Sequence, residues 1–215
     1  MQPIVCCLDL FCGAGGAGMG LSRAGFDVTG VDILPQPRYP FRFVQGDALA
    51  QDLTGFDFVW ASPPCQAHTA MQHIRKNRHA HPDLIPAVRA KLEAWGGPWV
   101  IENVKGAPLR NAVMLCGTMF GLRIIKHRYF ETGFDLPCLL PPCNHRDVYD
   151  PWHGKGRTAD AMREAQGTPW IPASGGASRK RGTSGDCNNA IPPAYSEWIA
   201  RQWCTANASG EGREV

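Results

Sequence analysis

The stretch Ile4–Gly18 reads IVCCLDLFCGAGGAG and decides the fold class. Its first part, Ile4–Phe11, is an apolar run of strand length, and its second part is a glycine-rich turn before a short helical stretch, Gly20–Gly25. Further strands are predicted at Phe26–Ile33, Phe41–Gln45, Phe56–Ala61, Trp99–Asn103 and Ala112–Cys116, with a helix at Leu84–Trp95. This alternation predicts an α/β fold built on a mainly parallel sheet.

The glycine turn predicts a cofactor site. Gly13, Gly15 and Gly18 have the spacing of the dinucleotide-binding fingerprint, and Asp32 ends the next strand, where a carboxylate can accept hydrogen bonds from two ribose hydroxyls. Glycines between a strand and a helix also let a ligand approach the backbone N–H groups at the helix start. At this level a nicotinamide enzyme and an S-adenosylmethionine enzyme fit equally well.

Composition narrows the class of protein. Of the 215 residues, 44% are hydrophobic and 19% charged, which predicts a folded globular chain. The apolar run near the start is far shorter than the ~20 residues that span a bilayer, so we expect no membrane partner. Nine scattered cysteines, an odd number, favour a reducing cytoplasm. Acidic residues outnumber basic ones in residues 1–60, so the net charge of +3 is concentrated in the remainder, as expected if that part binds a polyanion.

The pattern changes after the first two thirds of the chain. Residues 137–185 are rich in Pro, Gly, Ser, Arg and Trp and show little periodicity apart from a possible helix at Thr158–Gln166. Apolar helical spacing returns after Pro192 and Pro193. We therefore predict a main domain at 1–136, a small loop-rich second lobe at 137–185, a segment at 186–204 that returns to the main domain, and a flexible tail at 205–215.

Two further strands end in residues that can do chemistry. Cys65 follows the strand Phe56–Ala61 and a stiff Pro63-Pro64 pair, which places the thiol at the carboxyl edge of the sheet, where open α/β folds bind ligands. Glu102 lies near the end of the strand Trp99–Asn103, where a buried charge is costly unless the site uses it. We expect both side chains to face one pocket beside the glycine turn.

In this order the motifs resemble those of the DNA cytosine-5 methyltransferase family. Residues 9–16 (DLFCGAGG) resemble the family's cofactor motif, Pro63-Pro64-Cys65-Gln66 its nucleophile motif and Glu102-Asn103-Val104 its cytosine-binding motif. Lys126-His127-Arg128 and residues 188–193 (NNAIPP) are weaker matches to a basic motif and a closing motif. The resemblance implies a Rossmann-like methyltransferase fold and a short protein of bacterial or phage type, located in the cytoplasm of a bacterial cell or of a phage-infected host.

The resemblance also implies a reaction and roles for named residues. The Cys65 thiolate would add to C6 of a flipped-out cytosine, Glu102 would bind N3 and the amino group, and Arg128 would hold the O2 side or a nearby phosphate. S-adenosylmethionine would donate the methyl group to C5. The residues expected around this cofactor are Phe11, Gly13, Gly15, Gly16, Asp32, Ile33, Asp47, Pro63 and Asn189.

The expected partner is double-stranded DNA, bound by a monomer. The lobe at 137–185 would read the target, and the residues between Gln66 and His81 would form a basic loop that closes over it. The DNA contacts expected from charge and position are Gln66, Arg75, Lys76, Arg78, Lys126, Arg179, Lys180 and Arg181.

Four residues of the second lobe are compatible with zinc. They are Cys138, Cys143, His145 and His153. Because no tight Cys-x2-Cys pair is present, and because a proline-rich lobe can carry such residues without a metal, we expect no metal site.

Three other functions are compatible with parts of this pattern. A nicotinamide-dependent oxidoreductase would use the same glycine turn but would leave Cys65 and Glu102 without a role. A DNA-binding relic without activity would explain the divergent closing motif. The same methyl transfer could also act on RNA, as it does in one branch of the family.

Overall fold

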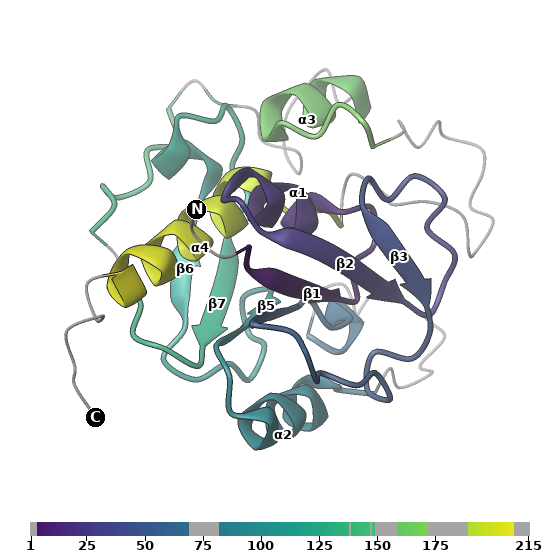
Figure 1. Cartoon of the computed structure of the whole chain (residues 1–215). Helices are drawn as coiled ribbons and strands as arrows, with labels where there is room; N and C mark the ends of the chain where they lie inside the picture. Colours follow the sequence, from purple (N-terminus) through teal and green to yellow (C-terminus); the bar gives the residue numbers. More distant parts are fainter. Residues whose placement is uncertain are drawn as a thin grey trace.

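The computed structural model describes residues 4–68, 82–137, 139–146, 148, 159–171 and 189–208. They form an α/β fold around a seven-stranded sheet with the strand order β3-β2-β1-β4-β5-β7-β6 (Figure 1). The strands are β1 (Cys6–Leu10), β2 (Asp27–Asp32), β3 (Arg42–Gln45), β4 (Phe58–Ala61), β5 (Trp99–Asn103), β6 (Val113–Leu115) and β7 (Arg128–Thr132). The Rossmann-like α/β fold with a mainly parallel sheet is therefore confirmed.

The parallel half of the sheet sets the position of the site. β1 pairs in parallel with β2 and β4, and β4 pairs in parallel with β5. The carboxyl ends of these strands consequently share one edge of the sheet, and the turn that follows β1 lies between the ends of β2 and β4. Asp32 and Glu102 reach this edge from β2 and β5.

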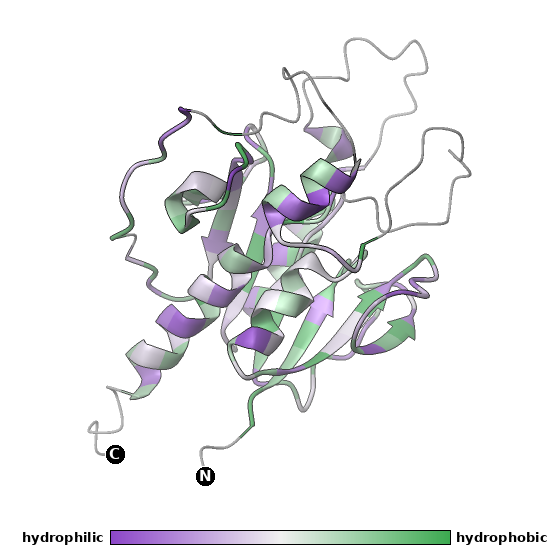
Figure 2. Cartoon of the chain, turned by 90° about the horizontal axis from the view of Figure 1, so that it is seen from above, coloured by the Kyte–Doolittle hydropathy of each residue, from purple (hydrophilic) through white to green (hydrophobic). Residues whose placement is uncertain are grey.

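Helices cover both faces of the sheet. On one face, α1 (Gly16–Arg23) and α4 (Pro193–Ala208) pack on apolar side chains such as Val28, Phe58 and Phe130. On the other face, α2 (Ile85–Trp95) buries Val88 and Leu92 against Leu8, Val59 and Ile101. Hydrophobic residues accordingly concentrate in the central strands, while the outer helices carry polar residues on their exposed sides (Figure 2). Each of the strands β1, β2, β4 and β5 thus contributes side chains to two cores, as expected for inner strands of a parallel sheet that is covered on both faces.

Small residues allow α1 and α4 to pack closely. A Cβ atom on Gly20 would lie 2.1 Å from both the Pro193 carbonyl oxygen and the Ser196 hydroxyl oxygen. The Ser196 hydroxyl donates a hydrogen bond to the Ala17 carbonyl oxygen at 2.8 Å. In this way the returning C-terminal helix is fixed directly beneath the glycine turn.

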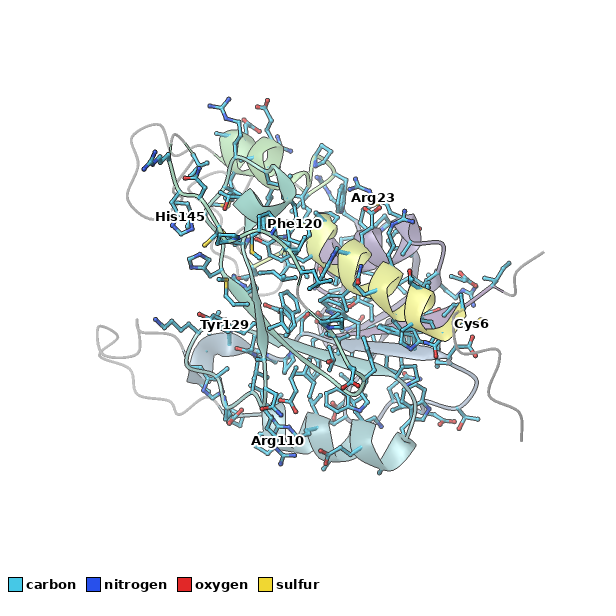
Figure 3. The ribbon with its side chains drawn as sticks, turned by 90° about the vertical axis from the view of Figure 1, so that its left-hand side faces the viewer. Cys6, Arg23, Arg110, Phe120, Tyr129 and His145 are labelled. Carbon is cyan, nitrogen blue, oxygen red and sulfur yellow. The ribbon has the colours of Figure 1, made fainter. Side chains whose placement is uncertain are left out.

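The segment 137–185, expected to form a second lobe, is represented by two described pieces, 137–148 with gaps and 159–171, and both contact the rest of the fold. In the second piece, Met162 and Ile171 pack against Ala14 and Ile124, and the Trp170 indole N–H donates to the Ala14 carbonyl oxygen at 3.0 Å. In the first piece, the Asn144 N–H donates to the Thr118 hydroxyl oxygen at 3.2 Å; Thr118 belongs to the 3₁₀ helix η3 (Gly117–Phe120), which ends at Phe120 (labelled in Figure 3). The Phe120 ring packs on Tyr195 of α4, with ring centroids 5.3 Å apart. Among the described residues, no helix is long and apolar enough to cross a membrane.

Three expectations about secondary structure need correction. The strand β7 was not predicted, and it runs antiparallel between β5 and β6. The helix α1 begins at Gly16 rather than Gly20, because its glycines lie within the helix, where they allow close packing against the C-terminal segment. The strand β6 is shorter than the strand predicted there. The helix α3 (Ala159–Gln166) agrees with its prediction to within one residue.

Candidate active site

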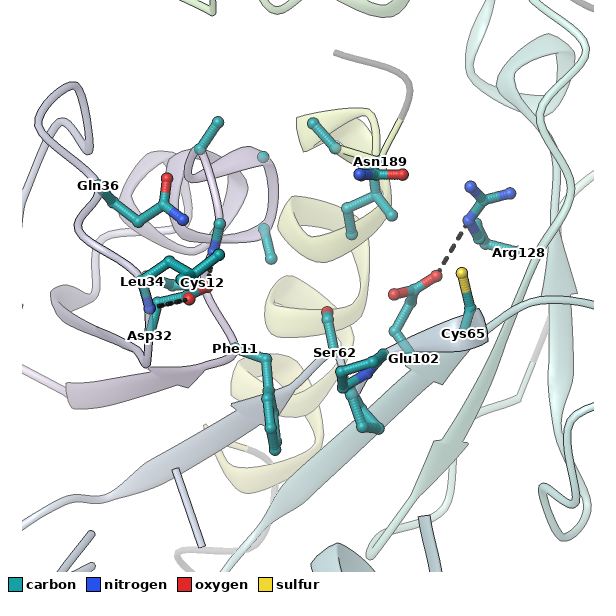
Figure 4. Close-up of a pocket in the computed structure, with 18 of the residues that line it drawn as sticks. Phe11, Cys12, Asp32, Leu34, Gln36, Ser62, Cys65, Glu102, Arg128 and Asn189 are labelled. Carbon is teal, nitrogen blue, oxygen red and sulfur yellow. Dashed lines mark hydrogen bonds and ion pairs between the residues drawn. The ribbon is translucent and has the colours of Figure 1, made fainter. Parts of the chain in front are cut away.

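A cleft of about 330 Å³ opens at the carboxyl edge of the sheet (Figure 4). One end is lined by the glycine turn with Asp32, and the other end by Cys65, Glu102 and Arg128. Between them lie apolar residues and Asn189 of the segment that returns before α4. The cleft has the size of a small-molecule site, and it places the glycine turn and a group of reactive side chains in one space.

The glycine turn is held by the carboxylate of Asp32. Its Oδ2 accepts a hydrogen bond from the Gly13 N–H at 3.0 Å, and its Oδ1 accepts one from the Leu34 N–H at 2.9 Å. Gly13 has a φ of +47°, and a Cβ atom there would meet nothing within 4 Å. Phe11 holds the unusual φ of +57°, a conformation that costs free energy in non-glycine residues and is concentrated at functional sites.

A buried acid lies beneath this turn. Asp9 is fully buried on β1, and its Oδ2 accepts a hydrogen bond from the Tyr39 hydroxyl at 2.9 Å. Burial raises the pKa of Asp9 to about 7, although the hydrogen bonds from Tyr39 and the Gly18 backbone oppose that rise. A Cβ atom on Gly18 would lie 2.6 Å from the Tyr39 oxygen, so the glycine makes room for this pair.

The loop after β4 presents Cys65 to the cleft. Cys65 begins the 3₁₀ helix η1 (Cys65–Ala67), directly after the two prolines. The Asn103 side-chain amide donates a hydrogen bond to the Pro63 carbonyl oxygen at 2.9 Å, which ties this loop to the end of β5. Burial, together with the negative charge of Glu102, raises the pKa of the Cys65 thiol, whereas the charge of Arg128 opposes that rise. The thiol is therefore protonated at neutral pH when no ligand is bound.

Glu102 and Arg128 form an ion pair in the wall of the cleft. Arg128 Nε lies 3.1 Å from Glu102 Oε1, and both side chains are largely buried. Arg128 Nη1 also donates to the His127 carbonyl oxygen at 2.9 Å. Burial raises the pKa of Glu102, although the charge of Arg128 and a hydrogen bond with Ser62 oppose that rise. A carboxyl group in this setting takes up a proton more readily than an exposed one.

The structure brings together most of the residues expected at the site. The cleft is lined by Phe11, Gly13, Gly16, Asp32, Ile33, Pro63, Cys65, Gln66, Glu102, Arg128 and Asn189. Gly15 is buried beside Tyr39 and Pro40 instead, and Asp47 accepts a hydrogen bond from the Leu49 N–H away from the cleft. Arg75, Lys76, Arg78, Arg179, Lys180, Arg181, Cys138 and His153 lie outside the described residues.

Lys126 does not have the position expected of a DNA contact. It is 5% exposed, and its ammonium donates to the Gln166 side chain at 2.9 Å and to the Ala190 carbonyl oxygen. Lys126 thus links the segment just before β7 to α3 and to the segment just before α4. Charge at a motif position predicted a surface contact, but the internal carbonyl and amide acceptors could not be foreseen from the sequence.

Sequence reasoning missed several residues that shape the site. The Ser62 hydroxyl oxygen accepts a hydrogen bond from the Trp60 indole N–H at 3.0 Å, and the Ser62 side chain also forms a hydrogen bond with Glu102. Gln36 and Val104 line the cleft. Ser62 lies between the end of β4 and the Pro63-Pro64 pair, and this position could have indicated that its hydroxyl faces the cleft.

Comparisons with known proteins find sequence similarity to a methyltransferase. No family model matches the sequence. The type II methyltransferase M.XorII of Xanthomonas oryzae pv. oryzae is 27% identical over 93% of this chain, and the chain spans half the length of that relative.

Solved structures overlap with part of the fold. A prophage-encoded protein of E. coli described as a DNA modification methyltransferase matches 59% of this chain and 45% of its own, with 20% identity and a TM-score of 0.45. A Dnmt2 variant from Spodoptera frugiperda matches 60% of this chain and 49% of its own, with 21% identity and a TM-score of 0.40. The S. pombe Dnmt2 methyltransferase matches 63% of this chain and 52% of its own, with 16% identity and a TM-score of 0.42. The sequence similarity to a type II methyltransferase confirms the methyltransferase resemblance that the order of the motifs predicts.

Proposed function

We propose that this chain binds S-adenosylmethionine at the glycine turn and transfers its methyl group to C5 of cytosine in DNA, with Cys65 as the nucleophile. The observation that carries the proposal is the single cleft shared by Asp32 and the glycine turn at one end and by Cys65, Glu102 and Arg128 at the other. The similarity to a type II methyltransferase supports it. A nicotinamide-dependent oxidoreductase would leave Cys65, Glu102 and Arg128 without a role.

The glycine-turn end of the cleft fits the cofactor. Open space at Gly13 leaves room for the amino-acid part, and each Asp32 oxygen, with one backbone partner, retains a lone pair for a ribose hydroxyl. Ile33 and Leu34 are 68% and 47% exposed at the rim, which is unusual for large apolar side chains and suits packing on adenine. When bound, S-adenosylmethionine supplies an electrophilic methyl group.

The residues at the other end can make cytosine C5 reactive. The Cys65 thiolate forms a bond to C6, and the displaced electron pair makes C5 nucleophilic. The bound cofactor would give its methyl group to C5, with cleavage of its sulfur–methyl bond, and would leave as a neutral thioether. Glu102 holds a proton at N3 and so neutralises the charge that develops on the ring, while Arg128 stabilises the O2 side. Loss of the C5 proton to a base then returns the electrons, breaks the C6–sulfur bond and frees Cys65.

The electrostatics of the cleft suit this sequence of steps. Glu102 is the acidic group that raises the pKa of Cys65, and Arg128 is the basic group that lowers it. A Glu102 that carries a proton therefore favours the thiolate of Cys65. Protonated Glu102 beside cationic Arg128 is the form that prepares both the nucleophile and the proton donor.

The expected substrate is double-stranded DNA with the target base rotated out of the helix, because a stacked base cannot reach a cleft of this kind. The chain would act as a monomer, in the cytoplasm of a bacterial or phage-infected cell. Its second lobe can present few side chains, and each good base contact discriminates by only ~1–3 kcal/mol, so a target of a few base pairs is expected.

Mechanism-based trapping tests the proposal directly. In DNA that carries 5-fluorocytosine, C5 cannot lose its substituent as a proton, so the methylated intermediate stays attached to the enzyme. Mass spectrometry should then find a DNA adduct on Cys65 that requires S-adenosylmethionine. The adduct should be absent in Cys65→Ala and retained in the matched control Cys204→Ser, a half-buried thiol on α4.

The possible outcomes separate the rival functions. An adduct on fluorinated RNA but on no DNA would move the reaction to RNA. Methylation of unmodified DNA without any adduct on the fluorinated substrate would contradict the role of Cys65. Binding of NADH without binding of S-adenosylmethionine in equilibrium dialysis would overturn the cofactor assignment.

A further inference from the structure

Four metal-ligating side chains meet outside the proposed active site. Cys116, His127, Cys143 and His145 each direct one ligand atom into a common space, and these atoms all lie within 4.8 Å of one another. Cys116 follows β6, His127 precedes β7, and the other two come from the first piece of the second lobe, where Figure 3 shows His145. Three separate segments of the chain therefore contribute to one cluster.

Three of the six distances between the four ligand atoms of the cluster are close to those of a tetrahedral zinc site, and all six are below 4.8 Å. His127 Nε2 lies 3.2 Å from His145 Nε2, Cys116 Sγ lies 3.5 Å from His145 Nε2, and Cys143 Sγ lies 3.8 Å from His127 Nε2. Usual zinc–ligand bond lengths imply edges of about 3.3 Å between two nitrogens and about 3.6 Å between nitrogen and sulfur in a regular tetrahedron. Each observed separation agrees with the corresponding edge to within about 0.2 Å.

We propose that Cys116, His127, Cys143 and His145 bind one structural zinc ion. The set has two thiolates and two imidazoles, so a bound Zn²⁺ would be neutralised by its own ligands. All four positions are filled by protein, which is typical of structural rather than catalytic zinc. Hydrogen bonds alone are a weaker explanation, because a thiol is a poor hydrogen-bond donor and two of the four groups are thiols.

Polar groups around the cluster also suit a metal-bound sulfur. The Thr118 hydroxyl donates to Cys116 Sγ at 3.4 Å, and the Asn144 N–H donates to the Thr118 oxygen at 3.2 Å. Donors of this kind stabilise a ligating thiolate and orient it. They also connect the loop that carries Cys143 and His145 to the end of β6.

The site would link the second lobe to the catalytic wall. His127 is the residue before Arg128, and its carbonyl oxygen accepts the Arg128 Nη1 hydrogen bond at 2.9 Å. Zinc bound at His127 would therefore hold the main chain that positions Arg128 beside Glu102. It would also anchor the start of the second lobe, which has few apolar residues of its own.

The test measures metal in the full-length chain rather than activity. Protein purified under reducing conditions, mixed with ZnCl₂ and desalted should retain about one zinc ion per chain by elemental analysis. Cys143→Ser and His145→Ala should each lower the retained zinc at least about tenfold after equilibration with a weak chelator. The matched controls Cys204→Ser and His68→Ala, which change the same residue types outside the cluster, should retain it.

A spectroscopic measurement keeps the test independent of how the variants fold. Co²⁺ added to the metal-free wild-type chain should give intense tetrahedral d–d bands and thiolate-to-cobalt charge transfer, and ZnCl₂ should abolish both. Octahedral, weakly absorbing cobalt would overturn the proposal. The proposal would also be overturned if the wild-type protein retained less than about a tenth of an equivalent of zinc. A disulfide between Cys116 and Cys143 in the reduced preparation would overturn it as well.

Discussion

The side-chain amide of Asn103 donates a hydrogen bond to the carbonyl oxygen of Pro63 at 2.9 Å. Through this contact the strand that carries Glu102 holds the loop that carries Cys65, although Asn103 and Pro63 are 40 positions apart in the sequence. Asn103 is buried, and its own Oδ1 accepts the Val104 N–H at 2.9 Å. The relative position of the proposed nucleophile and proton donor therefore depends on a residue that performs no chemistry.

Asn103→Ala is expected to reduce turnover more than it reduces cofactor affinity. Loss of the hydrogen bond leaves the buried Pro63 carbonyl unpartnered and should lower the free energy of unfolding by ~1–3 kcal/mol. The loop at Cys65 then becomes less ordered, while the glycine turn is untouched. Steady-state methylation kinetics and S-adenosylmethionine dialysis separate the two effects. Asn207→Ala, an exposed change near the end of α4, is the control. An unchanged kcat would contradict the positioning role.

Glu102→Gln is expected to make Cys65 more reactive toward alkylation while it abolishes most of the methyl transfer. The negative charge of Glu102 raises the pKa of the Cys65 thiol, so its removal lowers that pKa and increases the thiolate fraction at neutral pH. Iodoacetamide modification should be roughly several-fold faster. Methylation should fall about 10²–10⁴-fold, because glutamine cannot supply a proton to N3.

The control for this pair of effects is Glu93→Gln, which removes an exposed carboxylate that pairs with Arg110 on the surface. It should change neither rate. Slower alkylation in Glu102→Gln would mean that Glu102 does not act on Cys65 through its charge.

The buried Asp9 should make stability depend on pH in the direction opposite to that of an ordinary surface acid. Its pKa is raised by burial from the ordinary 3.8 to about 7, so between these values the folded chain binds a proton that the unfolded chain has lost. This group therefore lowers the free energy of unfolding as the pH rises from about 4 to about 7, and has no further effect above that range.

Asp9→Asn should remove this slope and retain the hydrogen bond from Tyr39. Urea unfolding at several pH values across the window would measure it. Asp57→Asn is a comparison on a neighbouring segment, since Asp57 accepts the exposed Cys6 N–H at 2.8 Å. Equal slopes for wild type and Asp9→Asn would contradict the assignment.

The buried ion pair between Arg89 of α2 and Glu131 of β7 should matter far more than the surface pairs. Arg89 Nε lies 2.6 Å from Glu131 Oε1, and the Arg110 N–H also donates to this carboxylate at 2.8 Å. Glu131→Gln or Arg89→Met should cost about 3–5 kcal/mol, because each leaves a charge or strong donor buried without its partner. Asp27→Asn, which breaks the exposed pair with Arg42, should cost less than about 1 kcal/mol. Chemical denaturation gives both values, and similar costs at the two sites would refute the comparison.

The sequence alone determined the parallel half of the sheet and the order of the site motifs. The strands β1, β4 and β5 are rich in apolar residues, because both faces of the sheet are covered, and such runs can be recognised locally. A residue that directly follows such a run must lie at the carboxyl edge. The positions of Asp32, Cys65 and Glu102 were predictable for that reason.

Only the tertiary structure decided what depends on long-range pairing. β7 inserts antiparallel between β5 and β6 and brings Arg128 to Glu102, a proximity that the family resemblance implied but that hydropathy along the chain does not indicate. The same pairing takes His127 to Cys116, and the lobe supplies Cys143 and His145, whereas the sequence suggested Cys138 and His153 as their companions. Lys126 likewise found internal acceptors in place of a surface role. Spacing along the chain predicts which residues end a strand, but contacts between segments depend on how strands pair and loops pack.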